Sequence, residues 1–140
     1  MKRIFTLILT LSVLLSCGTV ALASEAEGTR SSLTLAGYNV RLLSKTKGTV
    51  TVSFEVTSSK RATSLGIESI IFYTSDGVQV SSVSGSTSNG LIQSNNSAHA
   101  GDYKYSLSSG KSYYAEVTVF AEAGGDYDSR TITTSTVTVR

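Results

Sequence analysis

Apolar and polar side chains alternate strictly through one segment of the chain, residues 49–57. Its even-numbered residues are all apolar, and its odd-numbered residues are threonine, serine or glutamate; the apolar set is Val50, Val52, Phe54 and Val56. Successive side chains of a β-strand point to opposite faces of a sheet, so a period of two predicts a half-buried strand. A chain built from such segments buries its apolar side chains against a sheet face.

Similar segments recur along the chain, separated by short polar stretches that contain glycine. Besides 49–57, we expect strands near 33–42, 67–73, 78–83, 103–107, 113–121 and 131–139. No segment shows a convincing helical period, and proline is absent. About seven strands at this spacing predict an all-β fold, an immunoglobulin-like sandwich of two antiparallel sheets.

Three local patterns refine this prediction. The apolar positions change from odd to even numbers around Gly37, which predicts a β-bulge there. Residues 67–73 are apolar on both faces, so we expect a central strand and place Tyr73, like Tyr38, in the core. Residues 85–101 are rich in serine, asparagine and glycine, which predicts a long loop with room for a short strand.

The N-terminus has the pattern of a secretory signal. Lys2 and Arg3 precede an apolar run over residues 4–15, which is shorter than the roughly 20 residues that a membrane-spanning helix needs. Small residues end the segment, so we expect cleavage after Ala23 or Ser24. Residues 1–23 are then a signal peptide, and residues 24–140 are a single domain exported from the cell.

A second interpretation of the same segment stays open. Leu14-Leu15-Ser16-Cys17-Gly18 is similar to a bacterial lipobox, in which Cys17 would be lipidated and would hold the protein at the cell surface. Residues 19–23 remain mostly apolar, where a lipoprotein begins a polar tether, so the sequence favours simple cleavage.

Charge and cysteine content exclude several functions. Two of the twelve basic residues lie in the signal, which leaves ten basic against ten acidic residues in a formally neutral domain, so a nucleic-acid partner is not expected. Cys17 is the only cysteine, so the exported domain has neither a disulfide nor a CxxC metal site. We expect no cofactor.

Catalytic constellations are weak, and we expect a protein that is not an enzyme. His99 is the only histidine, and no nucleophile-elbow GxSxG motif is present. Asp126 and Asp128 lie at a predicted turn, but the spacing of an EF-hand calcium loop is missing. A glycosidase pair made by Asp102 with Glu116 or Glu122 is weaker still, since exposed strand faces commonly carry charges.

Tyrosine is the most suggestive material for a binding surface. Tyr rings provide flat contact area for sugars and anchors for protein partners. Alternation places Tyr113 in the core and leaves four candidate surface aromatics: Tyr103, Tyr105, Tyr114 and Tyr127.

Two segments resemble the fibronectin type III pattern: Val50-Thr-Val-Ser-Phe54 and Leu107-Ser-Ser-Gly110-Lys-Ser-Tyr113-Tyr-Ala115-Glu-Val117. The resemblance implies that Phe54 takes the place of the usual tryptophan. It also implies that Tyr113 forms a tyrosine corner, with its hydroxyl bonded to nearby backbone.

Over nearly all of the exported domain, the chain resembles a family of small, uncharacterised secreted proteins of Gram-positive anaerobic bacteria. The matching segments are Glu27-Gly-Thr-Arg30-Ser-Ser, Val50-Thr-Val-Ser-Phe54, Lys111-Ser-Tyr-Tyr-Ala-Glu-Val117 and Asp128-Ser-Arg130. This resemblance implies secretion but no assigned activity.

We therefore expect a secreted or cell-surface binding module for an unknown protein or glycan. The alternative is a structural protein that self-assembles through strand edges, with the Thr-rich last strand as the candidate edge because it carries few charges. A hydrolase that uses His99 ranks last. The exported domain should not insert into a membrane unless Cys17 is lipidated.

Overall fold

The computed structural model describes residues 34–140, and the predicted signal, with Cys17, Ala23 and Ser24, lies outside these residues. The described part is all-β and contains no helix. Its strands form one antiparallel sheet of seven members: β1 (Leu35–Thr46), β2 (Thr49–Thr74), β3 (Gln79–Ser84), β4 (Ile92–Ser106), β5 (Ser112–Ala123), β6 (Asp126–Thr133) and β7 (Val137–Thr138).

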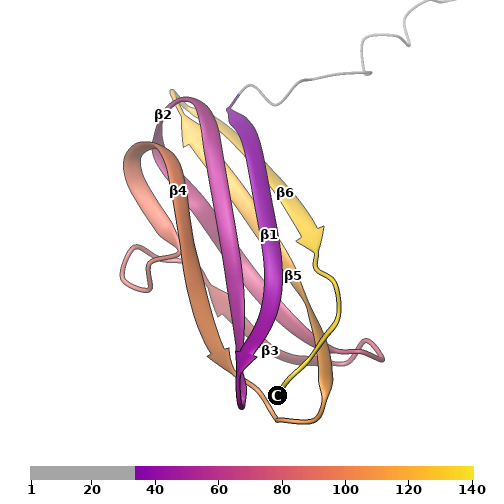
Figure 1. Cartoon of the computed structure of the whole chain (residues 1–140). Coiled ribbons are helices and arrows are strands. Elements are labelled where there is room, and N and C mark those ends of the chain that lie inside the picture. The colour runs from indigo at the N-terminus through magenta and orange to yellow at the C-terminus, as the bar shows by residue number, and fades with distance from the viewer. Residues whose placement is uncertain (1–33) are drawn as a thin grey trace, which may run out of the picture. The chain divides into compact units, whose positions relative to one another are not determined.

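The 26-residue strand β2 organises the sheet. Its first half, residues 49–58, pairs with β1 along one edge and with residues 98–106 of β4 along the other. Its second half pairs with β5 along one edge and with β3 and the start of β4 along the other. Both β2 and β4 turn at the upper end of the molecule in Figure 1, so each strand belongs to both halves of the sheet.

Side chains from both halves bury themselves in one core. Val50, Val52 and Val56 of the first half are fully buried, as are Ile70 and Phe72 of the second. Alternate residues of β5 complete the cluster: Tyr113, Ala115, Val117, Val119, Ala121 and Ala123. Burial of each Val or Ile side chain contributes about 1.5–3 kcal/mol, so this shared core holds the two halves together.

The β-bulge predicted near Gly37 is confirmed, because the pairing of β1 with β2 shifts register between Leu35 and Gly37. The prediction for Tyr38 is wrong. It lies opposite the buried Val56, yet 47% of its surface is exposed. Since β1 is paired along only one edge within residues 34–140, a large side chain at this position can extend past the rim of the described sheet.

A second bulge corrects the placement of Tyr73. The register of β2 with β5 shifts between Ile67 and Ser69, so Ile67 and Ile70 both point into the core although their numbers differ in parity. Tyr73 consequently points outward, opposite Tyr114 of β5. The central position predicted for this strand is confirmed, since β2 has partners along both edges there.

The predicted loop over residues 85–101 is wrong for most of its length. Residues 85–91 form a loop, but β4 begins at Ile92 and places His99 within a strand. The predicted last strand is also divided, into β6 and the short β7. Thr134 lies between them, where its hydroxyl accepts a hydrogen bond from the backbone N–H of Ala115 at 3.0 Å.

Candidate functional site

The four candidate surface tyrosines fall into two separate groups. Tyr103 and Tyr105 lie opposite Val52 and Val50, on the side of β4 that faces the core, and both are half-buried against it. Tyr114 and Tyr127 belong to β5 and β6 and lie on the opposite, outer side of the sheet. The structure therefore does not gather the four rings on one surface.

An open hollow lies beside Tyr105, where β3 and the end of β4 come together. We call it the edge hollow; its volume is ≈ 510 Å³, within the range typical of ligand sites, and it is lined by Thr74, Val80, Ser81, Tyr105, Ser106, Leu107, Ser108, Lys111 and Tyr113. Two aromatic rings and four hydroxyl-bearing side chains other than tyrosine lie among these residues. The hollow therefore offers both apolar surface and many hydrogen-bonding groups.

The ring of Tyr105 is fixed at the wall of this hollow. It stacks on the fully buried Phe72, with ring centroids 4.7 Å apart and planes 19° from parallel. Its hydroxyl lies 2.5 Å from the hydroxyl of Ser81, which joins β4 to β3. Because one ring face is covered by Phe72, the accessible part of Tyr105 is held in place without a ligand.

Among the described residues, Lys111 is the only charged one that lines the edge hollow. It follows Gly110 at the turn into β5 and is exposed to solvent. Residues 34–140 contribute no carboxylate to this lining, so the electrostatic character that they give it is neutral to positive. A ligand with hydroxyl groups or an anionic group suits this lining better than a cation does.

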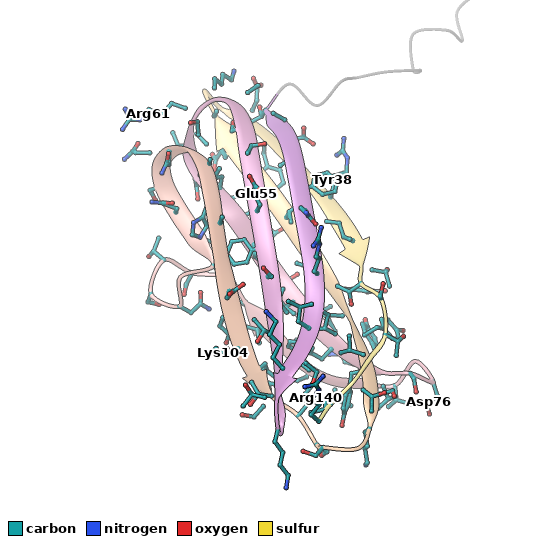
Figure 2. All side chains as sticks on the ribbon, viewed as in Figure 1. Tyr38, Glu55, Arg61, Asp76, Lys104 and Arg140 are labelled. Atoms are coloured by element: carbon teal, nitrogen blue, oxygen red, sulfur yellow. The ribbon has the colours of Figure 1, made fainter. Side chains whose placement is uncertain are left out.

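A second hollow of ≈ 510 Å³ lies on the outer side of β1, the first half of β2 and β4. Glu55, at its centre, faces the viewer in Figure 2, and its lining also includes Asn39, Arg41, Ser53 and Asp102. Residues of both charges lie in this lining, and its described residues include neither tyrosine nor tryptophan. Such a surface is typical of a solvated sheet face.

The outer tyrosines are occupied by contacts within the protein. Tyr114 stacks on Tyr73 with centroids 5.2 Å apart, and the Tyr73 hydroxyl donates a 3.2 Å hydrogen bond to Glu116. Burial and this carboxylate raise the pKa of Tyr73. The facing sides of the two stacked rings are covered by each other, so this pair does not offer a flat platform to a sugar.

Tyr127 repeats this arrangement near the other end of β5. It stacks on Phe120 at 5.8 Å, and its hydroxyl donates a 2.8 Å hydrogen bond to Glu68. Burial and the neighbouring carboxylate raise the pKa of Tyr127 as well, although 52% of its surface remains exposed. Packing between neighbouring strands therefore explains the positions of both outer candidates, Tyr114 and Tyr127.

Tyr113 is buried as the alternation along its strand predicts, with 3% of its surface exposed. No hydrogen bond of the Tyr113 hydroxyl is found within residues 34–140. It lies instead at the wall of the edge hollow.

The polar residues considered for catalysis or metal binding are separated from one another. His99 donates through Nε2 to the carbonyl oxygen of Gly90 at 2.8 Å, since that oxygen can only accept, and its ring packs edge-on against Phe54. Asp126 lies 3.5 Å from Lys60, and Asp128 lies 2.8 Å from Arg130. In the part of the chain that the structure describes, no three His, Cys, Asp or Glu residues are grouped to hold a metal ion.

Sequence reasoning missed the residues that complete the edge hollow, above all Ser81 and Lys111. The strands predicted near 67–73 and 78–83 lie side by side in the structure, as part of β2 and as β3. The approach of Tyr105 to Ser81 depends on the bends of β2 and β4, for which no residue pattern gives a signal.

Comparison with protein-family models, with curated proteins and with solved structures gave no match in any of the three. The resemblance to a family of secreted proteins therefore stays a prediction. In residues 34–140, no helix is long and apolar enough to cross a membrane.

Proposed function

We propose that this protein is a secreted, non-enzymatic binding module that takes a glycan in the edge hollow. The observation that carries the proposal is the fixed ring of Tyr105 beside Ser81 and Lys111. Sugar ligands need an aromatic surface for their apolar ring faces and hydrogen-bonding groups for their hydroxyls. Lys111 adds affinity for a sugar that carries a carboxylate.

The proposed architecture is an immunoglobulin-like sandwich similar to fibronectin type III domains. Its first layer would be β1, the first half of β2 and the second half of β4; its second layer would be β3, the second half of β2, β5 and β6. The pairing pattern and the single shared core support this division, as does the burial of Phe54 and Tyr113 at the positions that the resemblance implies. The edge hollow then lies at the rim of the two layers, so a ligand that binds there leaves the core between them undisturbed.

The test is a screen of the purified protein on an array of neutral and acidic glycans, followed by calorimetry with any glycan that binds. Tyr105→Phe removes the hydroxyl and keeps the contact with Phe72, while Lys111→Ala removes the charge. We expect each to weaken binding about tenfold, which corresponds to one charge-assisted or buried hydrogen bond.

Lys45→Ala is the matched control, because Lys45 is an exposed lysine of β1 that does not line the edge hollow. It should bind as the unchanged protein does. The proposal fails if no glycan binds, or if the Lys111 and Lys45 variants lose affinity equally.

A further inference from the structure

β4 has an open edge. From Ala98 to Ser106 it pairs with β2 along one side, and along its other side no strand among residues 34–140 is paired with it. In an antiparallel pair, alternate N–H and C=O groups point away from the partner strand. Those of β4 point to solvent and can accept a further strand, which natural proteins usually prevent with charges, bulges or a covering segment.

The edges formed by β1 and β6 carry charges that discourage pairing with another strand. β1 has Arg41 and Lys45, so two copies of β1 side by side would bring only positive charges together. β6, whose end overlaps the strand over 131–139 in which we expected self-assembly, directs Asp128 toward the inner side of the sheet and bonds it to Arg130 at 2.8 Å. Inward-pointing charges of this kind discourage edge pairing, so the structure argues against β6 as the assembly edge.

The edge of β4 is chemically different. Residues 77–101 contain no Lys, Arg, Asp or Glu, so neither the preceding loop nor the first part of β4 repels another strand. The first charges are Asp102 and Lys104, which lie on the outer face of β4 and are exposed. Neither belongs to an ion pair formed within the described residues.

Asp102 and Lys104 are complementary to the same two residues of another copy. If two β4 strands lie antiparallel about a twofold axis at Tyr103, Asp102 of each copy is opposite Lys104 of the other. The same register sets Tyr105 opposite Gly101. Opposite-charge cross-strand pairs stabilise antiparallel pairing.

We infer that β4 pairs edge to edge with β4 of a second copy of this chain, in the register centred on Tyr103. In this register residues 100–106 of the two copies face one another, and these seven residues span about 23 Å at the usual rise per residue of a strand. The contact extends β1, β2 and β4 into a sheet that continues through the second copy. An interface of this size forms a weak, reversible dimer. Asp102 and Lys104, on whose charges the inference rests, do not line the edge hollow, so reversing these charges tests the dimer separately from the proposed glycan site.

Analytical ultracentrifugation of the purified protein over a range of concentrations tests this inference. We expect a monomer–dimer equilibrium that weakens as salt is added. Asp102→Lys and Lys104→Asp should each weaken association about tenfold, because each creates two like-charge contacts across the twofold axis. The double variant D102K/K104D restores both opposite-charge contacts, and its dissociation constant should return to within about threefold of the original value.

Glu55→Lys is the control, since it changes the net charge as much as Asp102→Lys does but lies on β2, one strand inward from the open edge. Figure 2 shows Glu55 and Lys104 on the same side of the molecule, over different strands. Circular dichroism would verify that each variant is folded. A protein that stays monomeric, a dimer that ignores the single charge reversals, a double variant that remains weak, or an equal loss in Glu55→Lys would each overturn the inference.

Discussion

Two tyrosines on the outer side of the sheet each donate a hydrogen bond to a glutamate. Tyr73 bonds to Glu116, and Tyr127 bonds to Glu68. Burial and the carboxylate raise both tyrosine pKa values above the ordinary 10.0. The folded protein therefore holds these two phenol protons more tightly than the unfolded chain does.

The sign of the resulting pH dependence follows from linkage. A group with a raised pKa contributes stability that is complete below its unfolded pKa and is lost as the pH rises through its folded pKa. We expect the free energy of unfolding, measured with urea, to fall as the pH rises above about 10, the unfolded pKa, and through the raised folded pKa values.

The double variant Y73F/Y127F should show a smaller fall over this interval, since phenylalanine has no proton to lose. Tyr103→Phe is the control, as no hydrogen bond with a carboxylate involves Tyr103 among the described residues. Equal pH dependence in the double variant and the original protein would contradict the assigned cause.

Two glycines allow backbone segments to cross closely where β3 and β4 meet β2. A Cβ atom on Gly85 would lie 1.8 Å from the carbonyl oxygen of Ile67, and one on Gly66 would lie 2.1 Å from that of Leu91. The crossing also carries two backbone hydrogen bonds, from Gly85 to Glu68 and from Ile67 to Leu91. A side chain at either glycine would force the two segments apart.

Gly85→Ala should therefore destabilise the protein by about 2–4 kcal/mol, measured by urea unfolding, through steric clash and loss of these hydrogen bonds. Gly90→Ala is the comparison, because Gly90 has φ = 76° but no atom near a Cβ position. Its cost is limited to the backbone strain, about 1–2 kcal/mol. If Gly85→Ala is as stable as Gly90→Ala, the backbone at Gly85 can shift away from Ile67 at no cost, which would contradict the predicted clash.

At the level of elements, the sequence predicted those strands in which one face is buried along the whole length. The strand over 49–57 and the strand over 113–121 lie within β2 and β5, because each alternates between core and exterior. The first part of β4 was missed because it lies at a sheet edge and its residues are mostly serine, asparagine and alanine. With little burial on either face, no hydrophobic period marks it.

The candidate site was predictable only in part. Tyr105 was selected as a surface aromatic, but its half-buried position and its contact with Ser81 depend on how the sheet curls. Tyr73 was misplaced because one extra residue near Glu68 reverses the direction of every side chain after it. Alternation cannot show such a bulge when both faces carry apolar residues.

In the described residues, two strands and the C-terminal residues join the two halves of the sheet. β2 and β4 each run through both halves, and the C-terminal residues close the opposite end. The N–H of Gly48 donates to the carbonyl of Arg140, and the N–H of Gly110 donates to that of Val139. Val139 is itself buried in the common core.

Because of these shared elements, neither half can unfold while the other keeps its pairing and its core. We expect calorimetry to show one transition, with equal calorimetric and van't Hoff enthalpies. Val52→Ala in the first half, Val117→Ala in the second half and Val139→Ala at the C-terminus each remove two buried carbon atoms, at a cost of about 2 kcal/mol. Each should lower the single Tm by roughly 10 °C. Two separate transitions, or a variant that lowers the melting temperature of one half alone by NMR, would mean that the halves are independent units joined only by chain connectivity.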